Sequence, residues 1–195
     1  SVVCSLNKTF YVGSIAGYCT GNIFNCSNDG PVTGKSTIFE INNYTGGLVG
    51  CATATAKISY SYNTGDVFAN SYSYSTSASK YDKHYAGGIV GFANAATVIE
   101  CCYNTGEISA KATGYNSSYQ SSAYAAGISY LGVISNCYNT GAVTTSVHDV
   151  HGKTHSCGIG GITTNCYNYD LVTGTTQRYA VAVEKGSQSY YLAET

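Results

Sequence analysis

A five-residue phrase, Cys-Tyr-Asn-Thr-Gly, recurs along the 195 residues and constrains the fold more than any other feature of the sequence. Its copies align on one asparagine each, and the outer two copies are degenerate, as terminal repeats usually are. The anchors are Asn28, Asn63, Asn104, Asn139 and Asn168. Repetition at about 30 to 40 residues is typical of arrays in which equivalent units stack. We therefore expect residues 1–195 to form a single repeat domain.

A second, glycine-rich phrase precedes each anchor and is clearest at residues 46–50 and 87–91. Short β-branched segments such as residues 97–100 lie between the two phrases, bounded by Gly or Asn, which is typical of strands rather than helices. A unit of this size cannot bury its own apolar face, so neighbouring units must stack. The sequence predicts an all-β fold, a right-handed parallel β-helix of about five coils with Tyr/Ser-rich insertions.

Stacked coils place equivalent residues about 4.8 Å apart, so the anchor asparagines can form a ladder of amide hydrogen bonds. Asn tolerates the left-handed backbone conformation, and glycine accepts a positive φ at little steric cost. We therefore expect the phrase to form a stacked turn. The glycines that end its three clearest copies are Gly65, Gly106 and Gly141.

The pairing of Gly-Gly-Leu-Val-Gly with Cys-Tyr-Asn-Thr-Gly-x-Val resembles the GLUG motif, over roughly residues 13–175. That motif recurs in bacterial surface and secreted proteins, including adhesin-like chains and the repeats associated with IgA-specific metalloproteases. The resemblance implies a solenoid-like repeat region with a surface or attachment role. It supplies no catalytic residues to carry over to this chain.

Composition limits the classes of partner and the cellular compartment that we expect for this chain. A formal net charge of −1 with 10% charged residues argues against nucleic-acid binding. No apolar run reaches the roughly 18 residues that a membrane span needs. Nine cysteines without any Cys-x-x-Cys spacing favour an oxidising, secreted or cell-surface location. No motif indicates a cofactor.

Four cysteines occupy the slot two residues before an anchor, and Ser61 fills that slot in the second repeat; they are Cys26, Cys102, Cys137 and Cys166. A spacing of about 4.8 Å between stacked Cβ atoms slightly exceeds the usual disulfide range, which leaves buried thiols as an option. The remaining five are better placed for bridges between coils: Cys4, Cys19, Cys51, Cys101 and Cys157. Because nine is odd, at least one thiol is free or pairs with another chain.

Two insertions between the repeats, residues 70–85 and 111–124, are rich in Tyr and Ser. This composition is typical of adaptable binding surfaces, and a packed tyrosine ladder or a plain loop is the alternative. Partners would be a second copy of the chain, or a host or cell-surface glycan or protein. The candidate contact residues are Tyr72, Tyr74, Tyr81, Tyr85, Tyr115, Tyr119 and Tyr124.

Two clusters could carry chemistry. His148, His151 and His155 are weak candidates for a metal site, because imidazole suits Zn²⁺ and Cu²⁺, although a solvated loop explains them as well. Asp66 and Glu107 occupy the same slot in adjacent coils. Stacking would place their side chains near the roughly 5 Å separation of the two carboxylates in retaining glycosidases, which makes them weak catalytic candidates. Hydrated carboxylates at a turn are the alternative.

Three functions follow from these features. The first is a non-enzymatic adhesion or binding module outside the cell. The second is a structural subunit of an extracellular filament that assembles through open strand edges, with residues 176–195 as a C-terminal strand or assembly segment. The third is a carbohydrate-active β-helix enzyme, a polysaccharide lyase or glycoside hydrolase.

Overall fold

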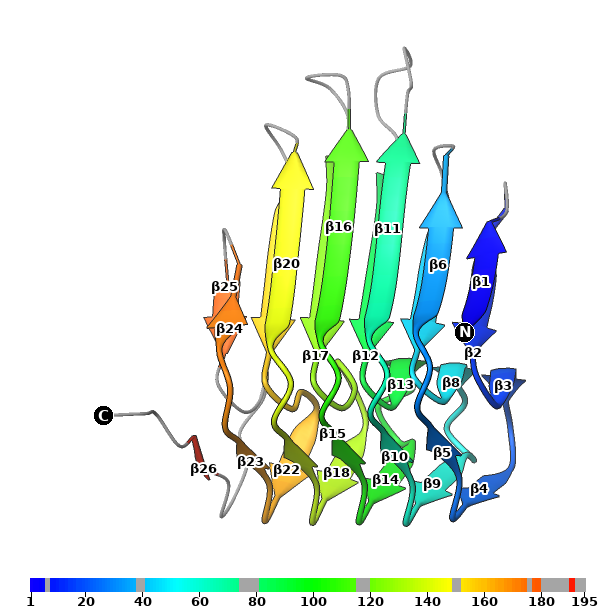
Figure 1. Cartoon of the computed structure of the whole chain (residues 1–195), viewed down its shortest axis with the longest axis vertical. Coiled ribbons are helices and arrows are strands. Elements are labelled where there is room, and N and C mark those ends of the chain that lie inside the picture. Colours follow the sequence, from blue (N-terminus) through cyan, green and yellow to red (C-terminus); the bar gives the residue numbers. More distant parts are fainter. Residues whose placement is uncertain are drawn as a thin grey trace.

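The computed structural model describes residues 1–5, 8–37, 41–73, 81–114, 120–148, 152–174, 177–179 and 190–191. In these ranges every regular element is a β-strand, and the paired strands run parallel. Each strand lies beside its equivalent from the next passage of the chain, so that the sheets are stacks of similar strands (Figure 1). The predicted all-β, parallel, solenoid-like architecture is confirmed.

Two sheets contain the longer strands and form the taller part of the molecule (Figure 1). Sheet A consists of β1 (Val2–Ser5), β6 (Val32–Ser36), β11 (Val67–Ser73), β16 (Ile108–Gly114), β20 (Val143–His148) and β24 (Val172–Thr173). Sheet B consists of β2 (Phe10–Gly13), β7 (Asn42–Gly46), β12 (Tyr81–Gly87), β17 (Gln120–Ala126), β21 (Lys153–Cys157) and β25 (Gln177–Tyr179). The inner faces of the two sheets pack on each other mainly through small side chains, among them Ala69, Ala110 and Ala125.

Three sheets of shorter strands complete each coil. Sheet C consists of β3 (Ala16–Cys19), β8 (Val49–Ala52) and β13 (Val90–Ala93). Sheet D consists of β4 (Asn22–Phe24), β9 (Lys57–Ser59), β14 (Val98–Glu100), β18 (Val133–Ser135) and β22 (Ile162–Thr164). Sheet E consists of β5 (Ser27–Asn28), β10 (Tyr62–Asn63), β15 (Tyr103–Asn104), β19 (Tyr138–Asn139), β23 (Tyr167–Asn168) and β26 (Tyr190–Tyr191). Within residues 176–195, β25 and β26 continue sheets B and E.

The anchor asparagines form a continuous ladder inside sheet E. The Nδ2 group of each donates to the Oδ1 of the next anchor at 2.7 Å, over four steps from Asn28 to Asn168. Each Nδ2 also donates to the carbonyl oxygen two residues further along its own chain, at 2.6–2.8 Å. The side chains of Asn63, Asn104 and Asn139 are fully buried. Burying an amide is costly unless it is hydrogen-bonded, and here each Nδ2 donates both to the next anchor and to its own chain.

The two phrases of each repeat meet across the coil, which explains why they occur together. A Cβ atom on Gly47 would lie 2.5 Å from the Cγ of Asn63, and one on Gly88 would lie 2.5 Å from the Cγ of Asn104. Any side chain at these glycines would displace the asparagine ladder.

The left-handed residue of each coil does not lie where the sequence predicted. Positive φ occurs three residues before each anchor, at Asn25, Tyr60, Cys101, Asn136 and Asn165, with values of 51–53°. The anchors themselves belong to short strands, and the glycines two residues after them do not have positive φ. The prediction of a left-handed Asn-Thr-Gly turn was therefore wrong. Those glycines are required by close stacking, since a Cβ on Gly106 would lie 2.5 Å from the carbonyl carbon of Gly65.

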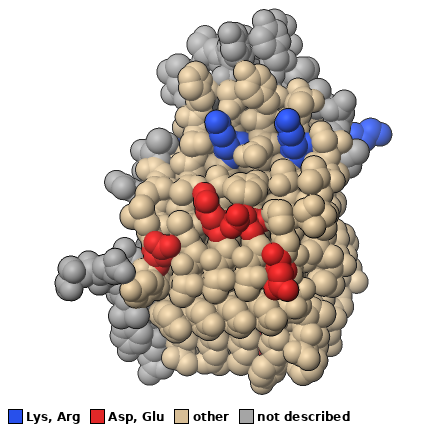
Figure 2. Space-filling model, in the orientation of Figure 1, with Lys and Arg blue, Asp and Glu red and all other residues tan. Residues whose placement is uncertain are grey.

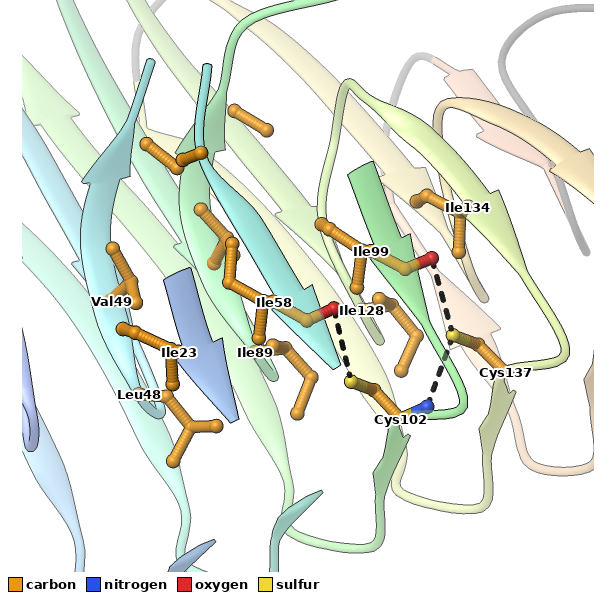
Figure 3. Close-up of a cluster of buried hydrophobic side chains, with 14 of the residues drawn as sticks. Ile23, Leu48, Val49, Ile58, Ile89, Ile99, Cys102, Ile128, Ile134 and Cys137 are labelled. Atoms are coloured by element: carbon orange, nitrogen blue, oxygen red, sulfur yellow. Dashed lines mark hydrogen bonds between the residues drawn. The ribbon is translucent and has the colours of Figure 1, made fainter. Parts of the chain in front are cut away.

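Ladders of aliphatic side chains fill the interior between sheets C, D and E (Figure 3). Sheet D supplies an isoleucine from each of four coils, and the glycine-rich phrase supplies the facing residue. The two rows are Ile23, Ile58, Ile99, Ile134, and Leu48, Ile89, Ile128, Ile159. Burying each of these side chains stabilises the fold by about 1.5–3 kcal/mol before entropy costs.

The cysteine ladder borders this core, and all nine cysteines of the chain are free thiols. The backbone N–H of Cys102 donates to the Sγ of Cys137 at 3.3 Å, and that of Cys137 to the Sγ of Cys166 at 3.4 Å (Figure 3). In the second repeat the Oγ of Ser61 accepts the same bond from Cys26 at 3.1 Å. Hydrogen bonds with the neighbouring thiols, followed by burial, raise the pKa of Cys137. The bridges expected between coils are absent. Register places other residues beside the cysteines that were expected to form them: Cys51 pairs with Tyr18 and Phe92, and Cys157 pairs with Ala126.

Replacing Asn104 with Leu should strongly destabilise the fold. The change removes two donated hydrogen bonds and leaves the Nδ2 of Asn63 without its acceptor in a buried site. We expect the free energy of unfolding to fall by about 2–4 kcal/mol in urea titrations. The control is Thr105→Ala at the exposed next residue, for which we expect less than about 0.5 kcal/mol. Equal losses in the two variants would contradict the role assigned to the ladder.

Candidate functional site

The longest described strands of sheets A and B border the Tyr/Ser-rich segments at residues 70–85 and 111–124. Strands β11, β12, β16 and β17 each contain seven residues, compared with five in β6 and β7. The connecting segments 74–80 and 115–119 lie outside the described residues. The long strands therefore extend the paired sheets into a blade above the aliphatic core (Figure 1).

A hollow of ≈ 220 Å³ lies against sheet A on this blade. Lys35, Asn70 and Lys111 occupy one register position on β6, β11 and β16, and Tyr72 and Thr113 occupy the row two residues further along. Ser36 and Ser71 complete the lining. Sequence reasoning missed the lysines because they belong to neither phrase; their position seven residues after the anchor in two repeats is the signal that was available.

Figure 2 shows the charges on the face formed by sheet A: basic side chains stand side by side in its upper part, with a band of acidic side chains below them. The acidic residues of this face occupy the turns that lead into the sheet A strands, as Asp66 does before β11 and Glu107 before β16. The face is thus divided into a basic upper part and an acidic lower part.

The outer face of sheet B carries a ladder of stacked rings. Centroids of successive rings are 4.4–5.3 Å apart and the planes lie within 17° of parallel. The ladder consists of Tyr11, Tyr44, Tyr85, Tyr124 and His155. Tyr85 is 6% exposed, and burial raises its pKa. Tyr85 is therefore a packing residue and not a contact residue, in keeping with the alternative of a packed tyrosine ladder, and Tyr124 is half-buried in the same stack.

The other predicted contact tyrosines have different positions. Tyr72 is 56% exposed and borders the hollow of sheet A. Tyr81 begins β12, but its side chain lies outside the described part, as do Tyr74, Tyr115 and Tyr119.

A second tyrosine ladder runs along sheet E, one residue before the anchors. Rings of neighbouring coils stack at 4.8–5.2 Å with planes within 6° of parallel. Its members are Tyr62, Tyr103, Tyr138 and Tyr167. The repeated Tyr-Asn pair was visible in the sequence, and the structure shows that its tyrosine packs on its own copies.

The three weak metal-site candidates do not form a group among the described residues. His148 is exposed at the end of β20 in sheet A, whereas His155 stacks on Tyr124 at 4.8 Å on the outside of sheet B. His151 lies outside the described residues. Within the described ranges no three His, Cys, Asp or Glu side chains come together to hold a metal ion.

Asp66 and Glu107 do lie in adjacent coils, but the Asp66 carboxylate has a local structural partner. Its Oδ1 accepts a hydrogen bond from the backbone N–H of Glu107 at 2.9 Å. The Asp29 carboxylate of the preceding coil likewise accepts from the hydroxyl of Thr64 at 2.9 Å. These contacts tie neighbouring turns together.

A buried pair that the sequence did not single out lies on β12. The Nε2 of His84 is 3.2 Å from the Oδ2 of Asp82, and both side chains are fully buried. Residues two apart on a strand share a face, so both side chains project between sheets A and B. Buried ionisable pairs are costly to break, because the remaining partner stays in a low-dielectric site.

The family comparison identifies the segment from Ile41 to Val67, which matches the GLUG motif model. This chain carries the GLUG motif. The matched segment contains both phrases of the second repeat, the glycine-rich one at residues 46–50 and the anchor Asn63. Searches of curated proteins and of solved structures find no match.

The GLUG segment is one structural repeat unit of the stack. Register pairs Asn42 with Lys83 at its beginning and Val67 with Ile108 at its end, so the next coil repeats the unit strand for strand. No helix in the described part of the chain has the length and hydropathy needed to cross a bilayer.

His155 should make the fold sensitive to acid. Burial, and secondarily the charge of Lys153, lower the pKa of His155 below its ordinary value. The unfolded chain then takes up the proton first, so the free energy of unfolding should decrease as the pH falls below about 6.5. His155→Tyr, which continues the tyrosine ladder, should reduce that decrease in urea titrations at successive pH values. The control is His148→Gln at the exposed histidine; an undiminished pH dependence in His155→Tyr would contradict the prediction.

Proposed function

We propose that this chain is a non-enzymatic adhesion or binding module that acts outside the cell. In the proposal a right-handed solenoid of about five coils is a rigid support, and the outer face of sheet A is the contact surface. The observation that carries it is the hollow beside Tyr72, where an exposed aromatic ring, two lysines and polar side chains gather on the blade. Tyrosine is among the residues that most often supply the energetic centres of binding surfaces.

The GLUG motif at residues 41–67 supports a surface role, since this motif recurs in repeat proteins of surface and adhesin type. The stack also suits this role physically. Each coil is bonded to its neighbours by backbone, amide and ring ladders, so the contact face is held on rigid elements.

Adhesion should depend on Tyr72. Beads coated with the folded chain should bind cultured epithelial cells, and Tyr72→Ala should weaken binding about tenfold by removing an aromatic anchor. The matched control is Tyr60→Asn: Tyr60 is also 56% exposed, and its slot already holds Asn in three other coils. Binding that is absent in the unmodified chain, or equally weakened in both variants, would refute the proposal.

A second candidate, a subunit of an extracellular filament, is supported by the edge of the first coil. Phe24 and Ile15 are 65% and 47% exposed there. Among the described residues, the Oδ1 of Asn28 accepts only a 3.4 Å bond from the N–H of Gly30, whereas later anchors accept a 2.7 Å bond from the preceding asparagine. This edge can therefore receive a further coil from a second copy of the chain.

Filament formation should appear as growth of the sedimentation coefficient between about 1 and about 100 µM protein. Ile15→Ser together with Phe24→Ser should reduce that growth, because the two changes make the edge polar. The control is Val133→Ser, a comparably exposed apolar residue in the middle of the stack. A single monomeric species over the whole range would exclude the filament.

A further inference from the structure

Two cations flank the hollow of sheet A at a defined spacing. Lys35 and Lys111 are exposed and lie on either side of Asn70 in register, so two strand spacings of about 4.8 Å separate their backbones by about 10 Å. Each ammonium group sits on a flexible four-carbon stem, so both can turn toward one group placed over Asn70. Within the part of the chain that the structure describes, neither lysine forms an ion pair.

The acidic band below the hollow does not neutralise this pair. Asp66 precedes Asn70 by four residues, which at about 3.3 Å per residue places the two backbones about 13 Å apart along the strand. The Debye length at physiological ionic strength is about 8 Å, so exposed charges at that separation are largely screened. The basic part of the face can therefore attract an anion independently of the band.

The remaining lining points to more than a simple anion. Tyr72 offers an exposed ring, Asn70 an amide and Thr113 a hydroxyl. The hollow of ≈ 220 Å³ is several times the roughly 30 Å³ that one water occupies. Aromatic rings pack on the apolar faces of sugar rings, while amide and hydroxyl groups bond to sugar hydroxyls.

We propose that this hollow binds an acidic saccharide, with Lys35 and Lys111 facing a carboxylate or sulfate group and Tyr72 packing on the sugar ring. The proposal rests on the proposed adhesion function and names its ligand class. Lysine acts as a point charge without the fork geometry of arginine, so the site accepts either anion. Single-site binding is weak, and a surface that displays many copies of the chain gains strength through multivalency on a polymer.

The test uses the full chain and three immobilised polysaccharides: a sulfated glycosaminoglycan, an unsulfated polyuronate and a neutral glucan. We expect binding to at least one acidic polymer, none to the neutral glucan, and loss of binding as salt rises from about 50 to about 300 mM. Binding to the sulfated polymer alone identifies sulfate as the recognised group, and binding to the polyuronate identifies carboxylate. Lys35→Gln with Lys111→Gln should weaken binding at least about tenfold, and Lys35→Arg with Lys111→Arg should retain it.

The matched control is Lys83→Gln with Lys153→Gln, which removes the same charge from exposed positions on sheet B. It should leave binding within about twofold, and urea midpoints should show that all variants remain folded. Equal loss in the two glutamine variants, or equal binding of the neutral glucan, would overturn the proposal. If beads adhere to cells through Tyr72 but no acidic polymer binds, the saccharide proposal fails and the adhesion function stands.

Discussion

The hydrogen-bonded ladder of anchor asparagines is the constraint on which the rest of the structure depends. Each amide bonds both to the next coil and to its own chain, at 2.6–2.8 Å, in the buried interior. Shifting one coil by a single residue would leave several buried amide groups unpaired, at about 1–3 kcal/mol each. The ladder also requires glycine at positions such as Gly47 and Gly88, whose missing side chains make room for it. Register is thereby set for every strand.

In-register parallel stacking places like residues on like residues, with opposite consequences for different side chains. Isoleucine, tyrosine and asparagine gain from contact with their own copies, as the core and the two ring ladders show. Like charges on adjacent strands repel one another. This fits the low charge content of 10% and the alternation of Lys35, Asn70 and Lys111. Where two acids are adjacent, Asp66 bonds to the backbone of Glu107.

The short-stranded sheets and the long-stranded sheets have different roles in the fold. The short sheets C, D and E hold the aliphatic core and the asparagine ladder, whereas sheets A and B pack through small residues and extend beyond it. Small interior side chains leave little apolar area to bury between sheets A and B, and the ring ladder of sheet B adds aromatic packing to the blade. The outer face of sheet A is the proposed contact surface.

The sequence by itself determined the parallel all-β stack, because two phrases that recur every 30 to 40 residues or so bury their apolar residues when equivalent residues lie in register. It also indicated the slots of Asn63 and Cys102, which are properties of one repeat. The left-handed residue at Tyr60, the free thiols, the burial of Tyr85 and the hollow beside Lys35 and Lys111 were decided by the tertiary structure. Each coil must bend to close, and the bend lies at the left-handed residue three positions before the anchor. Pairing of β6, β11 and β16 beyond the core then brings Lys35, Asn70 and Lys111 into one row beside the hollow.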